Sequence, residues 1–116
     1  MIQTKRVYEK PAKGDGFRVL VDRLWPRGLM KEKAKVHLWM KEIAPSDDLR
    51  KWFHHEEGSW GEFEKRYKSE LAKKKTLLSE LKKLMKEQGT VTLLFGSKNE
   101  KQNQAVVLAN VLKKEK

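Results

Sequence analysis

A short stretch of the chain, FRVLVDRLWPRG at residues 17–28, combines side chains that could bind an anion. An apolar run ends at Val21, and a carboxylate, two guanidiniums and an indole follow it closely: Asp22, Arg23, Arg27 and Trp25. Guanidiniums offer paired N–H donors to phosphate or carboxylate groups, and Asp22 could orient one of them. The cluster therefore predicts an anion site. The alternative is an internal salt-bridge network that braces the turn.

A second polar segment, GSKNEKQNQ at residues 96–104, follows the apolar run TVTLLFG at residues 90–96. Backbone N–H groups between a strand and a helix can receive an anion, although this segment lacks the spacing of a Walker loop. The ligand-binding residues predicted from the two segments are Asp22, Arg23, Trp25, Arg27, Ser97 and Lys98. Asp22 is the best candidate for a catalytic acid or base, and the sequence leaves open whether any reaction occurs.

Other chemistry finds little support in the residues, and we expect neither a cofactor nor a metal. The chain contains no cysteine, which excludes disulfides, thiolate catalysis and cysteine-ligated zinc. The sequence HHEE at residues 54–57 has no further ligand at a recognised spacing. His37 stands alone and is interpreted as a partly buried structural histidine. Trp25 and Trp39 could stack a ring, but aromatic residues near strand ends more often belong to the core.

The charge of the chain suggests an alternative function. The 27 Lys and Arg residues exceed the 16 Asp and Glu residues and give a net charge of +11. Such a field attracts polyanions, so a nucleic-acid-binding or regulatory protein is the second hypothesis. The lysines are spread along the chain, which favours a solvated charged surface over a dedicated nucleic-acid face. A structural or partner-binding module without ligand chemistry is the third hypothesis.

Length and apolar patterning bound the organisation of the protein. A chain of 116 residues suits a single domain, so we expect one domain over residues 1–116. The N-terminus lacks the apolar core of a signal peptide, and no run approaches the roughly 20 apolar residues that cross a bilayer. We therefore expect a cytoplasmic protein without a membrane partner. Its oligomeric state is left open.

The predicted elements alternate between strands and helices. Strands are expected at residues 2–8, 17–21, 36–43 and 90–96. Helices are expected at residues 29–35, after the N-cap Ser46, from Trp60 through Lys86 with a break near Lys73 to Lys75, and at residues 104–113. This order predicts a small layered α/β domain whose short, mostly parallel sheet is flanked by helices. Ligand sites in such sheets lie beyond the carboxyl ends of the strands, so the two polar segments should converge on one pocket.

Three segments carry a resemblance to a known family: residues 16–53, WGEFEKRYKSEL from Trp60, and VTLLFGSKNEKQNQAVVLANVL from Val91. The chain resembles the YeaO-like group within a bacterial and archaeal family of domains of unknown function. This resemblance covers nearly the whole chain and implies a small cytoplasmic α/β protein without an assigned activity. Many relatives read HNHA where this chain has QNQA at residues 102–105, so a role of those histidines does not carry over to Gln102 or Gln104. Asn103 is the matching polar residue and completes the predicted ligand-binding set.

Overall fold

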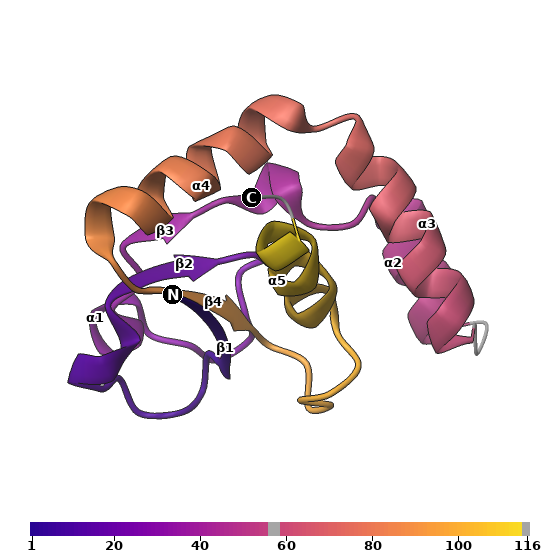
Figure 1. Cartoon of the computed structure of the whole chain (residues 1–116). Coiled ribbons are helices and arrows are strands. Elements are labelled where there is room, and N and C mark those ends of the chain that lie inside the picture. The colour runs from indigo at the N-terminus through magenta and orange to yellow at the C-terminus, as the bar shows by residue number, and fades with distance from the viewer. Residues whose placement is uncertain (56–58, 115–116) are drawn as a thin grey trace.

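The computed structural model of the chain describes residues 1–55 and 59–114 (Figure 1). Four strands form one sheet in the order β1-β4-β2-β3, and every pair is parallel. The strands are β1 (Ile2–Arg6), β2 (Phe17–Leu20), β3 (Leu38–Trp39) and β4 (Val91–Phe95). The helices are α1 (Lys31–Ala34), α2 (Asp47–His55), α3 (Trp60–Ala72), α4 (Lys75–Gln88) and α5 (Gln104–Lys114). The predicted α/β domain with a parallel sheet is confirmed.

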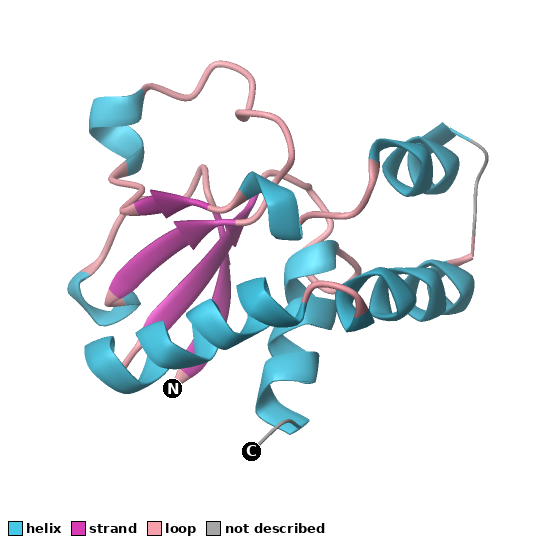
Figure 2. Cartoon of the chain, turned by 90° about the horizontal axis from the view of Figure 1, so that it is seen from above, coloured by secondary structure: helices cyan, strands magenta, loops and turns pink. Residues whose placement is uncertain are grey.

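The two faces of the sheet are covered in different ways. Helices α4 and α5 lie over one face, and α2 and α3 lie on the side toward which β2 points (Figures 1 and 2). Side chains alternate along each strand, so Val91, Leu93 and Phe95 pack in the main core with the helices. On the opposite face, Leu94 belongs to a smaller cluster, which is covered by Trp25, Leu29 and Val36 from the segment after β2 and by Trp39 of β3.

The central position of β4 follows from its composition. All of its residues, VTLLF, are buried, as expected of a strand that has a neighbour on each edge and cover on each face.

The helices of the described residues do not meet what a bilayer requires. None of them combines the length and the apolar composition of a membrane-spanning helix.

The predicted strand at residues 36–43 is shorter than expected. Only Leu38 and Trp39 pair with β2, and the chain then forms a 3-10 turn at Lys41–Ile43. β2 ends at Leu20, where its chain turns away, so β3 finds no partner beyond that point. The break expected near Lys73 is present, because α3 ends at Ala72 and α4 begins at Lys75.

Two polar residues, one in β2 and one just before β3, serve the fold. Arg18 is only 2% exposed, and its guanidinium forms an ion pair with Asp15 and donates to the carbonyls of Ala34 and Lys35. His37 is exposed and not partly buried as predicted, because it precedes the short edge strand β3. Its Nδ1 still accepts a hydrogen bond of 2.9 Å from the Arg18 backbone.

Candidate functional site

The turns that leave β2 and β4 meet at the carboxyl rim of the sheet. Asp22, which follows β2, accepts a hydrogen bond of 2.9 Å at Oδ2 from the backbone N–H of Gly96, which follows β4. Its Oδ1 accepts from Nε2 of Gln104, the first residue of α5. A Cβ atom at Gly96 would lie 2.9 Å from Asp22 Oδ2, so the glycine permits this close approach. One carboxylate thus ties both strand ends to α5.

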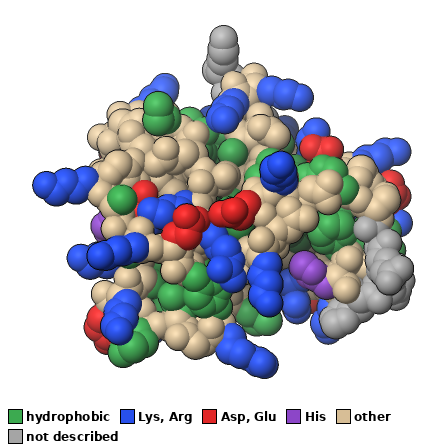
Figure 3. Space-filling view, turned by 90° about the horizontal axis from the view of Figure 1, so that it is seen from below, with side chains coloured by type: hydrophobic (Ala, Val, Ile, Leu, Met, Phe, Trp, Pro, Cys, Tyr) green, Lys and Arg blue, Asp and Glu red, His purple; other side chains and the backbone are tan. Residues whose placement is uncertain are grey.

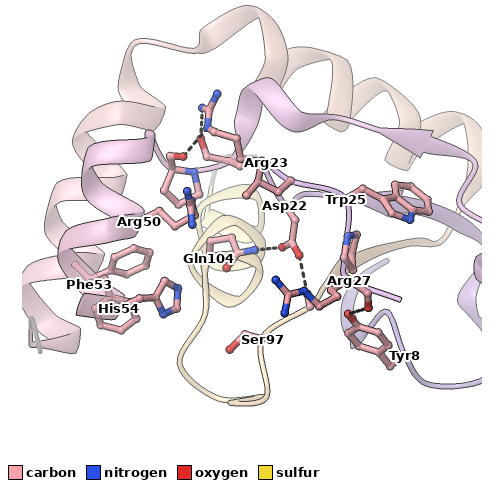
Figure 4. A pocket seen from close by; sticks show the side chains of 16 residues that line it. Tyr8, Asp22, Arg23, Trp25, Arg27, Arg50, Phe53, His54, Ser97 and Gln104 are labelled. Atoms are coloured by element: carbon pink, nitrogen blue, oxygen red, sulfur yellow. Dashed lines mark hydrogen bonds between the residues drawn. The ribbon is translucent and has the colours of Figure 1, made fainter. Parts of the chain in front are cut away.

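A pocket of about 460 Å³ opens beside this carboxylate, and we call it the rim pocket (Figure 4). Its wall combines the turn after β2, the turn after β4, the start of α5, and α2 with the segment before it. The lining residues are Tyr8, Asp22, Arg23, Leu24, Trp25, Pro26, Arg27, Ala44, Pro45, Arg50, Phe53, His54, Phe63, Gly96, Ser97 and Gln104.

Burial changes the acidity of the Asp22 carboxyl. Desolvation raises its pKa from 3.8 to about 6, while the hydrogen bonds from Gly96 and Gln104 act in the opposite direction. The group therefore exchanges its proton much closer to neutral pH than an exposed aspartate does. An acid or base poised in this range suits proton transfer, but it also suits a binding pocket whose charge depends on pH.

Arg23 braces the wall of the rim pocket. Its Nε donates to the Pro45 carbonyl at 3.0 Å, and its Nη2 donates to the Ala44 carbonyl at 3.2 Å. No salt bridge joins Asp22 to Arg23 or Arg27 within the described ranges, so the salt-bridge network considered as the alternative to an anion site is absent there. The bracing instead uses backbone carbonyls of the segment that precedes α2.

Side chains of α3 and of Lys74, between α3 and α4, hold the same segment, Ile43–Ser46. Tyr67 donates its hydroxyl to the Ile43 carbonyl at 2.7 Å, and Lys74 donates to the Ala44 carbonyl at 3.0 Å. Glu70 accepts from the backbone N–H of Ser46 at 2.8 Å and from its hydroxyl at 2.6 Å. Ser46 Oγ in turn accepts from the N–H of Leu49, which is the predicted N-cap interaction. These contacts fix where α2 begins.

The fixed start of α2 places three of its side chains in the rim pocket. Arg50, Phe53 and His54 are separated by three and four positions, so they share one face of the helix. Sequence reasoning missed Arg50 and Phe53 as pocket residues and considered His54 only as a metal ligand. The spacing of three and four positions does indicate that these side chains share a helix face. It does not indicate which part of the protein that face packs against.

Two arginines point into the rim pocket from opposite sides. Figure 4 shows the Arg27 side chain on the side of the β2 turn and Arg50 on the side of α2. The Arg27 guanidinium has no hydrogen bond or salt bridge to any other residue that the structure describes, and Tyr8 donates only to the Arg27 carbonyl, at 2.7 Å. Arg50 contacts Asp47 through Nη2 at 3.3 Å, but its buried Nε has no hydrogen-bond partner within the described chain.

The structure divides the predicted site residues into two groups. Five of them line the rim pocket: Asp22, Arg23, Trp25, Arg27 and Ser97. Trp25 packs edge-on against Trp39 and donates from Nε1 to the Leu29 carbonyl, so much of its surface serves the fold. Lys98 is exposed and does not line the pocket.

Asn103 also lies outside the lining of the rim pocket, for a structural reason. It is 2% exposed, and its Oδ1 accepts from the Val106 N–H at 3.0 Å, which caps the start of α5. Within the described residues no group of three potential ligands gathers around a metal site. Glu56 and Glu57 of the HHEE sequence lie outside the described residues.

The surface charge shows little clustering on the face drawn in Figure 3. Lys and Arg side chains are spaced over this face, with Asp and Glu side chains between them. The rim pocket gathers three arginines, Arg23, Arg27 and Arg50, around a single described carboxylate, Asp22.

The fold and the site together define a small parallel α/β protein with an arginine-lined pocket at the carboxyl rim of its sheet. The chain belongs to the family DUF488-N3i, described as the inactive DUF488-N3 subclade, whose family model matches residues 1–116. The uncharacterised protein YeaO of Escherichia coli (strain K12) is 46% identical over 112 residues, which cover 97% of this chain and 96% of that protein.

A mycobacterial relative gives a similar result. An uncharacterised protein of Mycobacterium tuberculosis (strain ATCC 25618 / H37Rv) is 40% identical over 111 residues, which cover 96% of this chain and 92% of that protein. No solved structure matches the chain significantly. The resemblance to the YeaO-like group is thus confirmed over nearly the whole length of the protein.

Proposed function

We propose that the protein binds a small anion, bearing a phosphate or carboxylate group, in the rim pocket between Arg27 and Arg50. One observation carries the proposal: two guanidiniums with unused donors point into a pocket where Asp22 is the only carboxylate among the described lining residues. Guanidiniums match the geometry of phosphate and carboxylate oxygens and form strong, charge-assisted hydrogen bonds with them.

The unpaired Arg50 Nε strengthens this proposal. A buried donor without a hydrogen-bond partner is costly to a folded protein, and such groups in native structures usually have a reason. An anion whose binding turned the Arg50 side chain further into the pocket would give this donor an oxygen to bond. The ion pair with Asp47 leaves the Arg50 side chain 31% exposed, so the guanidinium can contact a ligand without giving up its place on α2.

Ser97 and Asp22 add polar groups to the proposed site. The Ser97 hydroxyl oxygen accepts from the Asn99 N–H at 3.2 Å, which leaves its O–H free to donate to a ligand. Asp22 opposes an anion when it is ionised and favours one when it is protonated. The proposal assigns binding and no reaction, in agreement with the description of the family as an inactive subclade.

Calorimetric titration with inorganic phosphate and with sulfate tests the proposal. Arg27→Gln and Arg50→Gln should each weaken binding by about tenfold, because each removes a charged hydrogen-bond donor. The matched control is Lys86→Gln, which removes one positive charge from an exposed position of α4, away from the rim pocket. The control should retain nearly the affinity of the wild type.

Two results would count against the proposal. If neither phosphate nor sulfate bound the wild-type protein at millimolar concentration, the proposal would lose its basis. A Lys86→Gln variant that lost as much affinity as Arg27→Gln would mean that the overall charge of the protein, and not the rim pocket, attracts the anion.

A further inference from the structure

The side of the rim pocket formed by α2 and α3 is aromatic. Phe53 and Phe63 both line the pocket, and their ring centroids lie 4.3 Å apart with 26° between the ring planes. The His54 ring tilts against Phe53 at 58°, with a centroid separation of 5.5 Å. Figure 4 shows Phe53 and His54 next to Arg50, on the same side of the pocket. An aromatic wall therefore adjoins one of the two arginines.

The main core does not account fully for this wall. Phe63 is only 3% exposed and belongs to that core, whereas Phe53 is only partly buried and packs at its border. Another residue of α2, Leu49, is 5% exposed and supplies a buried apolar contact. Phe53 thus leaves apolar surface in contact with water inside a charged pocket, which is unfavourable unless something covers it.

The rim pocket is also larger than a bare phosphate or sulfate ion would fill. Its volume of about 460 Å³ falls in the range of pockets that hold organic ligands. A phosphate ion held between Arg27 and Arg50 would leave most of this volume to water beside Phe53. An organic group attached to the anion would displace that water.

We propose, building on the anion binding proposed above, that the ligand carries a flat aromatic ring joined to its anionic group, as in an aryl phosphate or a nucleoside monophosphate. The anionic group lies between Arg27 and Arg50, and the ring lies against Phe53. Aromatic rings attract one another in offset-stacked and edge-to-face arrangements. The guanidinium of Arg50, adjacent on the same helix, can also lie over the face of such a ring.

The test compares phosphate esters that differ only in the attached group. Phenyl phosphate should bind the wild-type protein about tenfold more tightly than methyl phosphate, because the ring adds apolar burial and stacking to the same anion. Cyclohexyl phosphate has an apolar ring of similar size that is not flat, and it should bind more weakly than phenyl phosphate. These three titrations use only the wild-type protein, so the inference does not depend on a variant that folds.

Variants then locate the ring. Phe53→Leu keeps an apolar side chain at the border of the core and should reduce the preference for phenyl over methyl phosphate to less than about threefold. The affinity for methyl phosphate, which carries no ring, should fall much less than the affinity for phenyl phosphate. Met30→Ala is the control, since Met30 is 55% exposed and does not line the rim pocket. This variant should keep the full preference.

The outcomes separate this inference from the proposed function. Equal binding of phenyl and methyl phosphate, with both lost in Arg27→Gln, would overturn the aromatic ligand and leave the anion site intact. Binding of neither ester would overturn both. A full preference that survives in Phe53→Leu would also overturn the inference, because the ring would then not lie against Phe53.

Discussion

Arg23 and Arg27 are close in sequence, but substituting them should have opposite consequences. Arg23→Ala removes two hydrogen bonds to backbone carbonyls, of 3.0 Å to Pro45 and 3.2 Å to Ala44. Lys74 continues to donate to the Ala44 carbonyl, so the Pro45 carbonyl suffers the larger loss. Arg27→Ala removes a guanidinium that has no partner among the described residues.

The expected stability losses follow from these contacts. Hydrogen bonds to charged groups contribute about 1.5–3 kcal/mol each. Partial exposure of Arg23 lowers this contribution, and Lys74 keeps the Ala44 carbonyl hydrogen-bonded in the variant. We therefore expect Arg23→Ala to lower the free energy of unfolding by about 2–3 kcal/mol. For a domain of this size such a loss lowers the melting temperature by roughly 8–12 °C. Arg27→Ala should change the free energy of unfolding by less than about 0.5 kcal/mol, as is usual for exposed side chains without partners.

Urea denaturation and thermal melting measure the stabilities, and phosphate titration measures binding. We expect Arg23→Ala to be the less stable variant and Arg27→Ala to be the variant that binds phosphate poorly. Equal stability of Arg23→Ala and wild type would refute the bracing role. A large destabilisation of Arg27→Ala without a change in phosphate affinity would instead favour the hypothesis of a module without ligand chemistry.

Three further predictions concern pH, backbone geometry and nucleic acid. Because burial raises the pKa of Asp22 from 3.8 to about 6, the folded state binds more protons than the unfolded state between these values, so its stability should fall as the pH rises through this window. Asp22→Asn should lack this component in urea denaturation series, and parallel profiles for the two proteins would contradict it. Gly16→Ala should destabilise by more than about 2 kcal/mol, because φ is 62° and a Cβ would lie 2.4 Å from the Thr90 carbonyl oxygen; Gly14→Ala, with open space, is the control for thermal melting. Any binding to DNA or RNA, which stays a prediction from the +11 charge, should weaken steeply between about 50 and 200 mM salt in anisotropy titrations, and salt-independent binding would argue for specific contacts.

The sequence predicted the sheet and one side of the pocket well. Apolar runs of the right length located β2 and β4, and a parallel sheet requires the segments after these strands to share a rim. Asp22 and Gly96, although 74 positions apart, are joined by a hydrogen bond for this reason. Strand direction and chain order are enough to place both residues at this rim, and local sequence patterns determine both.

The opposite side of the pocket depended on tertiary packing. Arg50 and Phe53 reach the rim because side chains of α3 and of Lys74, which follows α3, hold the Ile43–Ser46 segment, and no local pattern reveals these partners. Arg23 also shows that side-chain partners are hard to predict from sequence. As an arginine it was expected to contact a ligand, but it donates to backbone carbonyls 21 and 22 positions away. Residue type indicates what a side chain can bind, but only the fold determines what lies within its reach.

The segment after β2 both carries pocket residues and shields the second face of the sheet. Trp25 and Leu29 from this segment pack over Leu20 and Leu94, so a residue exchanged here risks exposing apolar strand surface. Arg50 and His54, the polar pocket residues of α2, do not belong to this apolar cover. Directed evolution toward a new ligand should therefore recover more folded variants from libraries at Arg50 and His54 than from libraries of equal size in the WPRG turn.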